Sequence, residues 1–217
     1  MTESTARFSD RVDDYVKYRP GYPAEAIDAV VALAGLAPGA AIVDVGSGTG
    51  ISARALLERG FAVFGVEPNA PMRAAAEREL ASFARFTSVD GTAEKTGLPD
   101  ASAALAIAAQ AFHWFRPEET RAELARVVAP PHWTALVWNE RLVDTPFLRE
   151  YEALLREHSS DYAKVDHRNI DRARIERFFG GPFETRAFPN VQRFDRAGFL
   201  GRARSSSYVP RTEAMTG

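Results

Sequence analysis

The chain has 217 residues, with 27 Lys and Arg against 29 Asp and Glu, and no cysteine. Its net charge of −2 gives no strong basic field, which argues against nucleic acid or a membrane surface as a partner. The absence of cysteine excludes disulfides, thiolate nucleophiles and iron–sulfur ligands, and the four scattered histidines suggest no metal site.

Apolar runs alternate with helical patterns through residues 1–140, which predicts an α/β fold with a mainly parallel sheet. Asn69 is expected to cap one of the helices, with Pro71 in its first turn. In chain order the pattern predicts a helix over Pro23–Leu36, a strand over Ala41–Val45, a glycine-rich turn over Gly46–Gly50, a helix over Ile51–Arg59, a strand over Phe61–Val66, a helix from Asn69 to Ala81, strands over Phe86–Val89 and Ala103–Ala109, a helix over Pro117–Val128 and a strand over Thr134–Trp138.

Residues 141–217 follow a different pattern. Helices are expected over Thr145–Ser159, Asp171–Phe179 and Asp195–Arg204, and a strand over Glu184–Phe188. No low-complexity linker interrupts the chain, so residues 1–217 are expected to form one domain. In that domain residues 1–36 supply a lid and a first helix, 37–140 a cofactor-binding core, and 141–217 substrate-side helices.

No targeting segment is visible in the sequence. The opening residues MTESTARFSD contain no apolar stretch of the secretory kind. Apolar runs such as Ala101–Ala109 are far shorter than the roughly 18–20 residues that a membrane helix needs. We therefore expect a cytoplasmic protein.

The strongest chemical signal is the turn over Gly46–Gly50, which follows a strand and opens a helix. Glycines let a backbone turn tightly and let a ligand approach it closely, and the helix start offers unpaired N–H groups. Glu67 ends the next strand, where a carboxylate can accept hydrogen bonds from ribose hydroxyls. The spacing G-x-G-x-G differs from the dinucleotide pattern G-x-G-x-x-G, and Asp44 stands two residues before the first glycine. There are two alternatives to a site for another class of cofactor. One is a tight turn that binds no ligand, and the other is the cofactor site of a dinucleotide-dependent oxidoreductase.

The segment from Asp44 to Gly50 resembles motif I of class I S-adenosylmethionine-dependent methyltransferases. Several further segments are similar to the type 11 methyltransferase domain group, which includes trans-aconitate methyltransferase-like proteins. They are Phe8 with Tyr15 and Tyr18–Pro23, Val66–Met72, Gly91–Glu94 with Leu98–Asp100, Ala109–Phe115, and Val137–Asn139. The resemblance implies a Rossmann-like sheet with helices on both faces, and transfer of a methyl group to a small-molecule acceptor such as a carboxylate or a hydroxyl.

The resemblance also implies a set of residues for S-adenosylmethionine, whose product is S-adenosylhomocysteine. The glycines and Asp44 would take the methionine part, Glu67 the ribose, and Arg19 the carboxylate of the cofactor. Met72 would pack on adenine, although ordinary core packing is the alternative for it. The full set is Tyr18, Arg19, Asp44, Gly46, Ser47, Gly48, Gly50, Glu67, Pro68, Met72, Thr92, Ala93, Glu94 and Gln110.

Candidates for the acceptor side follow from the same resemblance. His113 is a candidate general base, with a structural histidine as the alternative. Phe112 and Trp114 are candidates for binding the acceptor, although both would serve equally well in the core. An anionic acceptor would call for arginine in the pocket, and Arg19, Arg141 and Arg168 are the candidates.

Two departures from the family pattern bear on activity. Pro130-Pro131 stands where relatives have a Pro-Gly-Gly turn, and proline cannot replace a glycine of positive φ. The sequence also lacks the helix and final strand that relatives add, which would leave the edge of the fifth strand exposed. A homodimer would cover that edge. The alternative is a truncated or inactive protein that only binds the cofactor.

Overall fold

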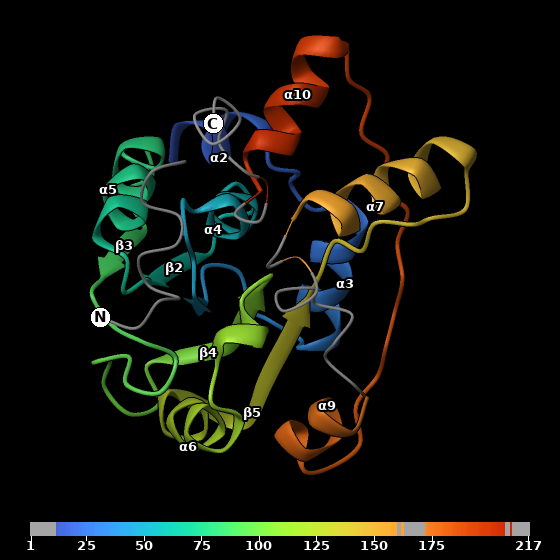
Figure 1. Cartoon of the computed structure of the whole chain (residues 1–217). Helices are drawn as coiled ribbons and strands as arrows, with labels where there is room; N and C mark the ends of the chain where they lie inside the picture. Colours follow the sequence, from blue (N-terminus) through green and yellow to red (C-terminus); the bar gives the residue numbers. More distant parts are fainter. Residues whose placement is uncertain (1–11, 160–161, 163–171, 207–208, 210–217) are drawn as a thin grey trace.

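The structure is a computed structural model, and it describes residues 12–159, 162, 172–206 and 209. Its centre is a five-stranded sheet in the order β3-β2-β1-β4-β5, in which every neighbouring pair is parallel (Figure 1). The α/β Rossmann-like fold expected from the sequence is therefore confirmed. The strands are β1 Ala41–Val45, β2 Ala62–Val66, β3 Phe86–Val89, β4 Ala103–Ala109 and β5 Val128–Val137.

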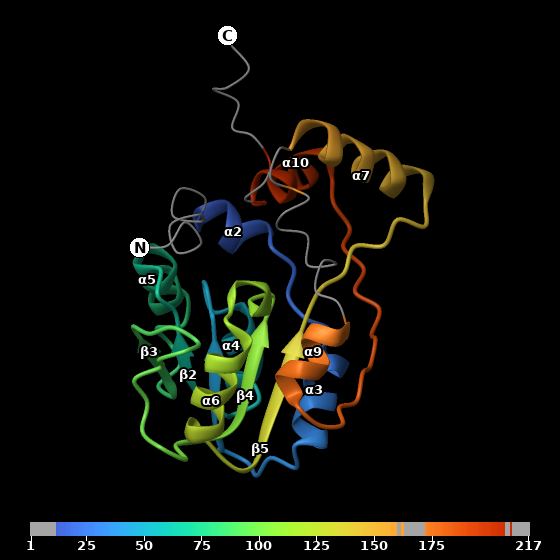
Figure 2. The same ribbon diagram turned by 60° about the horizontal axis from the view of Figure 1, so that its bottom comes forward.

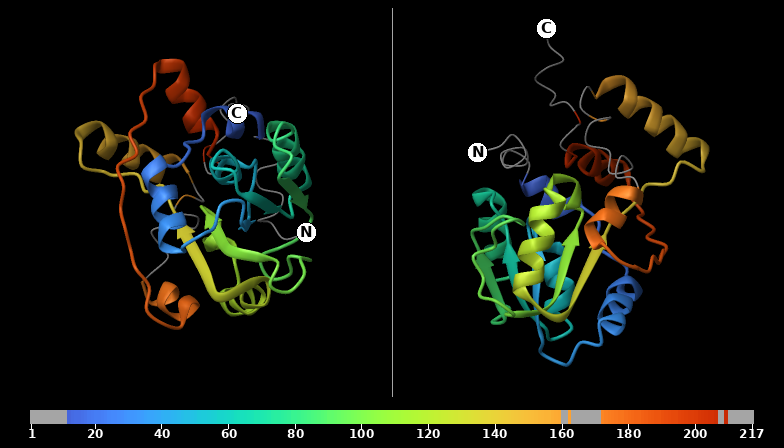
Figure 3. Two further views of the ribbon diagram at one scale, coloured as in Figure 1. Left: turned by 180° about the vertical axis from the view of Figure 1, so that it is seen from behind. Right: turned by 90° about the horizontal axis from the view of Figure 1, so that it is seen from below.

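Helices cover both faces of the sheet (Figure 3). On one face Ile42 and Leu105 of the strands pack with Leu56 of α4 and Ile27 of α3. On the other face Val43 packs in one cluster with residues of α6 and α9. The helical elements are α2 Val12–Tyr18, α3 Ala24–Leu33, α4 Ile51–Leu57, α5 Ala70–Glu79, the 3₁₀ turn η1 Phe112–Trp114, α6 Pro117–Val127, α7 Pro146–His158, α9 Arg172–Phe179 and α10 Arg196–Arg204.

Most predicted elements are present, and their starts follow the capping chemistry. The backbone N–H of Met72 donates to Oδ1 of Asn69 at 3.0 Å, which confirms Asn69 as the cap of α5. Thr145 and Asp195 cap α7 and α10 in the same way, so each helix begins one residue later than predicted. Strands β1, β3 and β4 have the predicted bounds because each is a short apolar run between turn residues.

Two predictions of secondary structure were wrong, and one helix was missed. Strand β5 begins at Val128 and not at Thr134, and it includes the two prolines, which an edge strand tolerates. Residues 184–188 form no strand, because no strand of the described part of the chain pairs with them and most of their side chains are exposed. Helix α2 was not predicted, since its sequence VDDYVKY is too short and polar for a clear helical period.

Helices α2, α7 and α10 lie beyond the carboxyl ends of the strands (Figure 2). Phe199 of α10 packs against Phe147 and Tyr151 of α7, with ring centroids 5.4 and 5.1 Å apart. These helices therefore lie over the edge of the sheet where ligands of parallel α/β folds bind. No helix in the described part of the chain is long and apolar enough to cross a bilayer.

Strand β5 is the outer strand of the sheet, next to β4. Within the described ranges no strand pairs with its other edge, and Trp133 on it is 40% exposed. That a second copy of the chain covers it stays a prediction.

Candidate functional site

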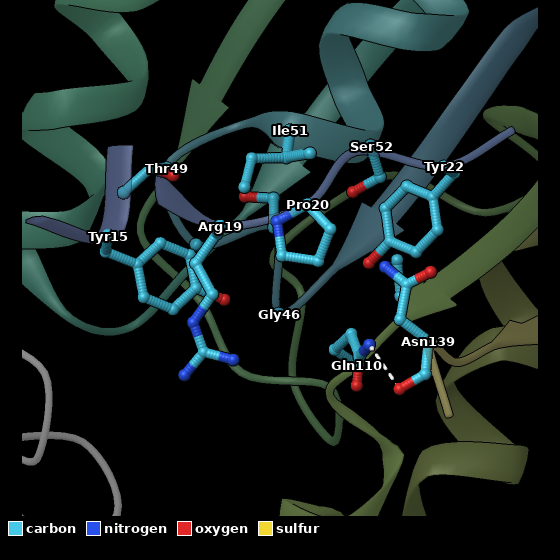
Figure 4. Close-up of a pocket in the computed structure, with 13 residues that line it drawn as sticks. Tyr15, Arg19, Pro20, Tyr22, Gly46, Thr49, Ile51, Ser52, Gln110 and Asn139 are labelled. Atoms are coloured by element: carbon cyan, nitrogen blue, oxygen red, sulfur yellow. Dashed lines mark hydrogen bonds between the residues drawn. The ribbon is translucent and has the colours of Figure 1, made fainter. Parts of the chain in front are cut away.

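A hollow that is open to solvent lies at the carboxyl end of β1 and β4 (Figure 4). The chain leaves β1 toward β2 on one side while β4 lies on the other, and such a reversal of strand order opens a crevice. The hollow is lined by Tyr15, Arg19, Pro20, Tyr22, Gly46, Ser47, Gly48, Thr49, Ile51, Ser52, Ala109, Gln110 and Asn139.

The glycine turn forms one wall of the hollow, and two of its positions accept only glycine. Gly46 has a φ of +70°, and a Cβ on it would lie 2.6 Å from Cβ of Ala111. Gly50 has a φ of +84°, and a Cβ on it would lie 2.6 Å from Cδ1 of Leu80. Both the backbone conformation and the close packing thus require glycine.

The acid after β2 holds this turn. Oε2 of Glu67 accepts a hydrogen bond of 2.9 Å from the backbone N–H of Gly48, and Oε1 accepts one of 2.8 Å from Asn69. Burial raises the pKa of Glu67, although these two hydrogen bonds lower it in part. A carboxylate oxygen can accept a second hydrogen bond, so Glu67 remains able to bind hydroxyl groups of a ligand.

Asp44, at the end of β1, is completely buried. Its Oδ2 accepts a hydrogen bond of 2.7 Å from Oγ of Ser52, whereas its Oδ1 has no partner. Burial raises the pKa of Asp44 to about 7, and the nearby Glu67 carboxylate adds to this. The hydroxyl of Thr49 and Nε of Arg19 are likewise buried without a hydrogen-bond partner. Such atoms are costly to leave unpaired, so a polar ligand with donors and acceptors fits this site.

The N-terminal segment closes the hollow from the opposite side. Tyr15, Arg19 and Tyr22 line it, and the guanidinium carbon of Arg19 lies 4.8 Å from the ring centroid of Tyr15 (Figure 4). Tyr18 does not line the hollow, because its ring packs against Gly201 of α10. Burial, with smaller contributions from Tyr15 and Asp44, raises the pKa of Tyr22 well above 10, so its phenol stays protonated.

Gln110 and Asn139 form the floor of the hollow at the ends of β4 and β5. Gln110 has a φ of +62°, and its backbone N–H donates to the carbonyl of Val137 at 2.8 Å. Nδ2 of Asn139 donates to the carbonyl of Gly21 at 3.1 Å, and Nδ2 of Asn190 donates to Oδ1 of Asn139 at 2.7 Å. The strand ends are thereby tied to the N-terminal segment.

The residues expected around adenine lie beside the hollow and not in its lining. Met72 is buried, with its methyl carbon 3.4 Å from the position that a Cβ on Gly48 would take. Ala93 is buried and Pro68 is half-buried, while the backbone of Thr92 pairs with that of Lys95. The carboxylate of Glu94 accepts a 2.9 Å hydrogen bond from the backbone N–H of Arg116 at the start of α6, and its role at adenine stays a prediction.

Apart from Arg19, the described residues predicted to bind or activate the acceptor also lie outside the lining of the hollow. Phe112 is fully buried in the core, with its ring centroid 4.8 Å from that of Phe178, and Trp114 packs against the same cluster. His113 lies beside Trp114, with ring centroids 4.6 Å apart, and does not line the hollow.

Arg141 is likewise held within the protein. Its Nη2 donates to the buried carboxylate of Glu152 and to the hydroxyl of Tyr162. Arg168 is outside the described residues. The amino-acid sequence did not single out Tyr15, Tyr22, Thr49, Ser52 or Asn139 for the site. The available signal was that the tyrosines belong to the same N-terminal segment as Arg19.

Comparisons with known proteins agree with this geometry. Residues 43–133 match a family model described as a methyltransferase domain. The chain is 38% identical over 149 residues to an uncharacterised methyltransferase of Mycobacterium tuberculosis, a match that covers 66% of this chain and 56% of that protein. It is 29% identical over 158 residues to an uncharacterised methyltransferase-like protein of Schizosaccharomyces pombe, covering 71% of this chain and 59% of the other. The chain thus spans little more than half the length of these relatives.

Solved structures show the same fold. A candidate type II methyltransferase of Anaeromyxobacter dehalogenans is 29% identical, with a TM-score of 0.62 over 92% of this chain and 83% of that one. A candidate S-adenosyl-L-methionine-dependent methyltransferase of Methanococcus maripaludis is 19% identical, with a TM-score of 0.56 over 82% of this chain and 77% of the other. The second likeness bears on the fold alone.

Proposed function

We propose that the chain is a class I S-adenosylmethionine-dependent methyltransferase and that it transfers a methyl group to a small-molecule carboxylate or hydroxyl. The observation that carries this proposal is the set of unpaired polar atoms around the hollow. Oδ1 of Asp44 is a buried acceptor and Nε of Arg19 a buried donor, so together they match a ligand with an ammonium and a carboxylate group.

The residues present fit the cofactor in its other parts as well. The glycine turn would hold its methionine part, and Glu67 would accept hydrogen bonds from its ribose hydroxyls. When bound, S-adenosylmethionine supplies an electrophilic methyl group on a sulfonium. The chain's own contribution is alignment, because a well-oriented pair of reactants can lower a barrier by roughly 7–11 kcal/mol.

The lining of the hollow favours an acceptor that is already ionised at neutral pH and needs no general base. Among the described residues that line it there is no histidine and no carboxylate that could act as a general base. Tyr22 stays protonated and can donate a hydrogen bond. The amide groups of Gln110 and Asn139 each donate one hydrogen bond within the protein, to the carbonyls of Asn139 and Gly21, and each has a second N–H. Donors of this kind suit a carboxylate acceptor better than an unionised hydroxyl.

Ligand binding tests the first part of this function. Isothermal titration with S-adenosylhomocysteine and with NAD should show binding of the former alone. The Asp44→Asn variant should weaken this binding, because it removes the charge that faces the ammonium group. Binding of NAD without S-adenosylhomocysteine would contradict the assignment.

A screen of acceptors tests the second part. Small carboxylic acids and phenols are incubated with S-adenosylmethionine, and release of S-adenosylhomocysteine is measured. We expect turnover with carboxylic acids, and His113→Gln should retain it because His113 lies outside the lining. Cofactor binding without turnover of any acceptor would favour a protein that only binds the cofactor.

A further inference from the structure

Helices α10 and α2 are packed so closely that only glycine fits at their contact. A Cβ on Gly201 of α10 would lie 2.3 Å from carbon atoms of the Tyr18 ring at the end of α2. Figure 2 shows α10 lying beside α2, beyond the carboxyl ends of the strands. A contact between segments so far apart in sequence positions one helix on the other.

A hydrogen bond joins the residues that directly follow the two helices, Arg19 after α2 and Ser205 after α10. Nη2 of Arg19 donates to the carbonyl of Ser205 at 3.1 Å, and Ser205 is completely buried at the end of α10. The carbonyls at a helix C-terminus carry partial negative charge, which favours a guanidinium there. One end of the Arg19 side chain is thereby fixed by α10.

The rest of the Arg19 side chain belongs to the hollow. Its guanidinium lies over the ring of Tyr15, both residues line the hollow, and its Nε is buried without a hydrogen-bond partner. Of the guanidinium nitrogens, Nη2 is therefore used to hold α10, while Nε is available to a ligand. Because the guanidinium group is planar and rigid, the bond that holds Nη2 also fixes the direction of the N–H at Nε.

We propose that α10 positions Arg19 for the methyl donor: the close contact at Gly201 and the carbonyl of Ser205 hold the guanidinium in the lining of the hollow that it shares with the glycine turn. This role rests on the proposed function, in which Arg19 meets the carboxylate of the cofactor. Gly201 is in this sense a positioning residue, which acts through Tyr18 and Arg19 and touches no ligand itself.

The Gly201→Ala variant tests this role, because it disturbs the contact with Tyr18 without weakening helix α10. Alanine favours a helix more than glycine does, so α10 itself gains stability while its new Cβ displaces Tyr18. Binding is measured by titration with S-adenosylhomocysteine and with 5′-methylthioadenosine, which lacks the amino-acid part of the cofactor. We expect about tenfold weaker binding of the former, as for loss of one hydrogen bond between charged groups, and unchanged binding of the latter.

Two further variants make the test specific. Gly181→Ala places the same methyl group where nothing lies within 4 Å, and it should bind both ligands as the wild type does. In the double variant Tyr18→Leu with Gly201→Ala, the smaller side chain leaves room for the new Cβ, and binding of S-adenosylhomocysteine should recover in part.

The outcomes distinguish this proposal from the proposed function. Equal loss of both ligands in Gly201→Ala, no loss at all, or the same loss in Gly181→Ala would overturn the role of α10 while the wild type still binds the cofactor. A wild type that binds neither ligand would instead overturn the proposed function, and the role of Arg19 with it.

Discussion

The backbone N–H of Gly48 donates a hydrogen bond of 2.9 Å to Oε2 of Glu67, so the acid after β2 shapes the turn after β1. The other carboxylate oxygen accepts from the N–H of Asn69, at the start of α5. One side chain thus joins two loops of the site. Folding and ligand binding should therefore respond together when Glu67 is changed.

The Glu67→Gln variant replaces one acceptor oxygen by an NH₂ group, which must face the N–H of Gly48 or of Asn69. A buried N–H left without an acceptor costs about 1–3 kcal/mol, and we expect the free energy of unfolding in urea to fall by this amount. Titration should also show weaker binding of S-adenosylhomocysteine. Unchanged stability would mean that these hydrogen bonds do not hold the turn.

Asp44 should make both stability and cofactor binding depend on pH. Burial raises its pKa from an ordinary 3.8 to about 7, so between these values the folded state holds a proton that the unfolded chain has lost. Its contribution to the free energy of unfolding is thus full below pH 4 and declines as the pH rises toward 7.

Cofactor binding should show the opposite dependence on pH. The ionised form of Asp44 attracts an ammonium group, so binding of S-adenosylhomocysteine should strengthen as the pH rises through about 7. Titrations below that pH, in buffers of different ionisation enthalpy, should detect release of a proton on binding. The Asp44→Asn variant should abolish this release, and a release that persists would assign the proton to another group.

Gly50 and Gly60 allow packing to be separated from backbone strain, since both have a φ of +84°. A Cβ on Gly60 meets nothing within 4 Å, so Gly60→Ala should cost about 1–2 kcal/mol of stability through strain alone. In Gly50→Ala the clash with Leu80 should add about 1–3 kcal/mol, measured by urea denaturation. Equal losses in the two variants would show that Leu80 moves aside at no cost.

Phe112 distinguishes a core residue from one that binds the acceptor. It is fully buried among Phe115, Trp138 and Phe178, so Phe112→Ala should lower the free energy of unfolding by about 3–5 kcal/mol. Phe112→Leu, which keeps most of the volume, should lose much less. If Phe112→Ala instead changed the KM for the acceptor and left stability unchanged, Phe112 would be assigned to acceptor binding.

The core of the fold was predictable because its signals are local. Strands β1 and β4 are apolar runs bounded by turn residues, and Asn69 with Pro71 defines the start of α5 by capping chemistry alone. Residues 184–188 misled the prediction, because an extended segment becomes a strand only when another strand pairs with it.

The site shows the same division between local and distant causes. The glycine turn and Glu67 come from neighbouring segments of one β-α-β unit, so their approach follows from the pattern. The direction of Arg141 depends on Glu152 in a later helix, and that of Tyr18 depends on a glycine in α10. Contacts between distant segments leave no periodic signal in a single sequence.

The carbonyl of Gly21 accepts hydrogen bonds from both Asn139 and Asn190, at 3.1 and 3.0 Å. These partners leave the ribosome long after Gly21 itself, and α10 follows them at residues 196–204. A nascent chain that ends before Asn139 can already pair its five strands, but it lacks both side chains that bond to the carbonyl of Gly21. The wall of the hollow that is synthesised first therefore gains these two hydrogen bonds only when much later residues have been made.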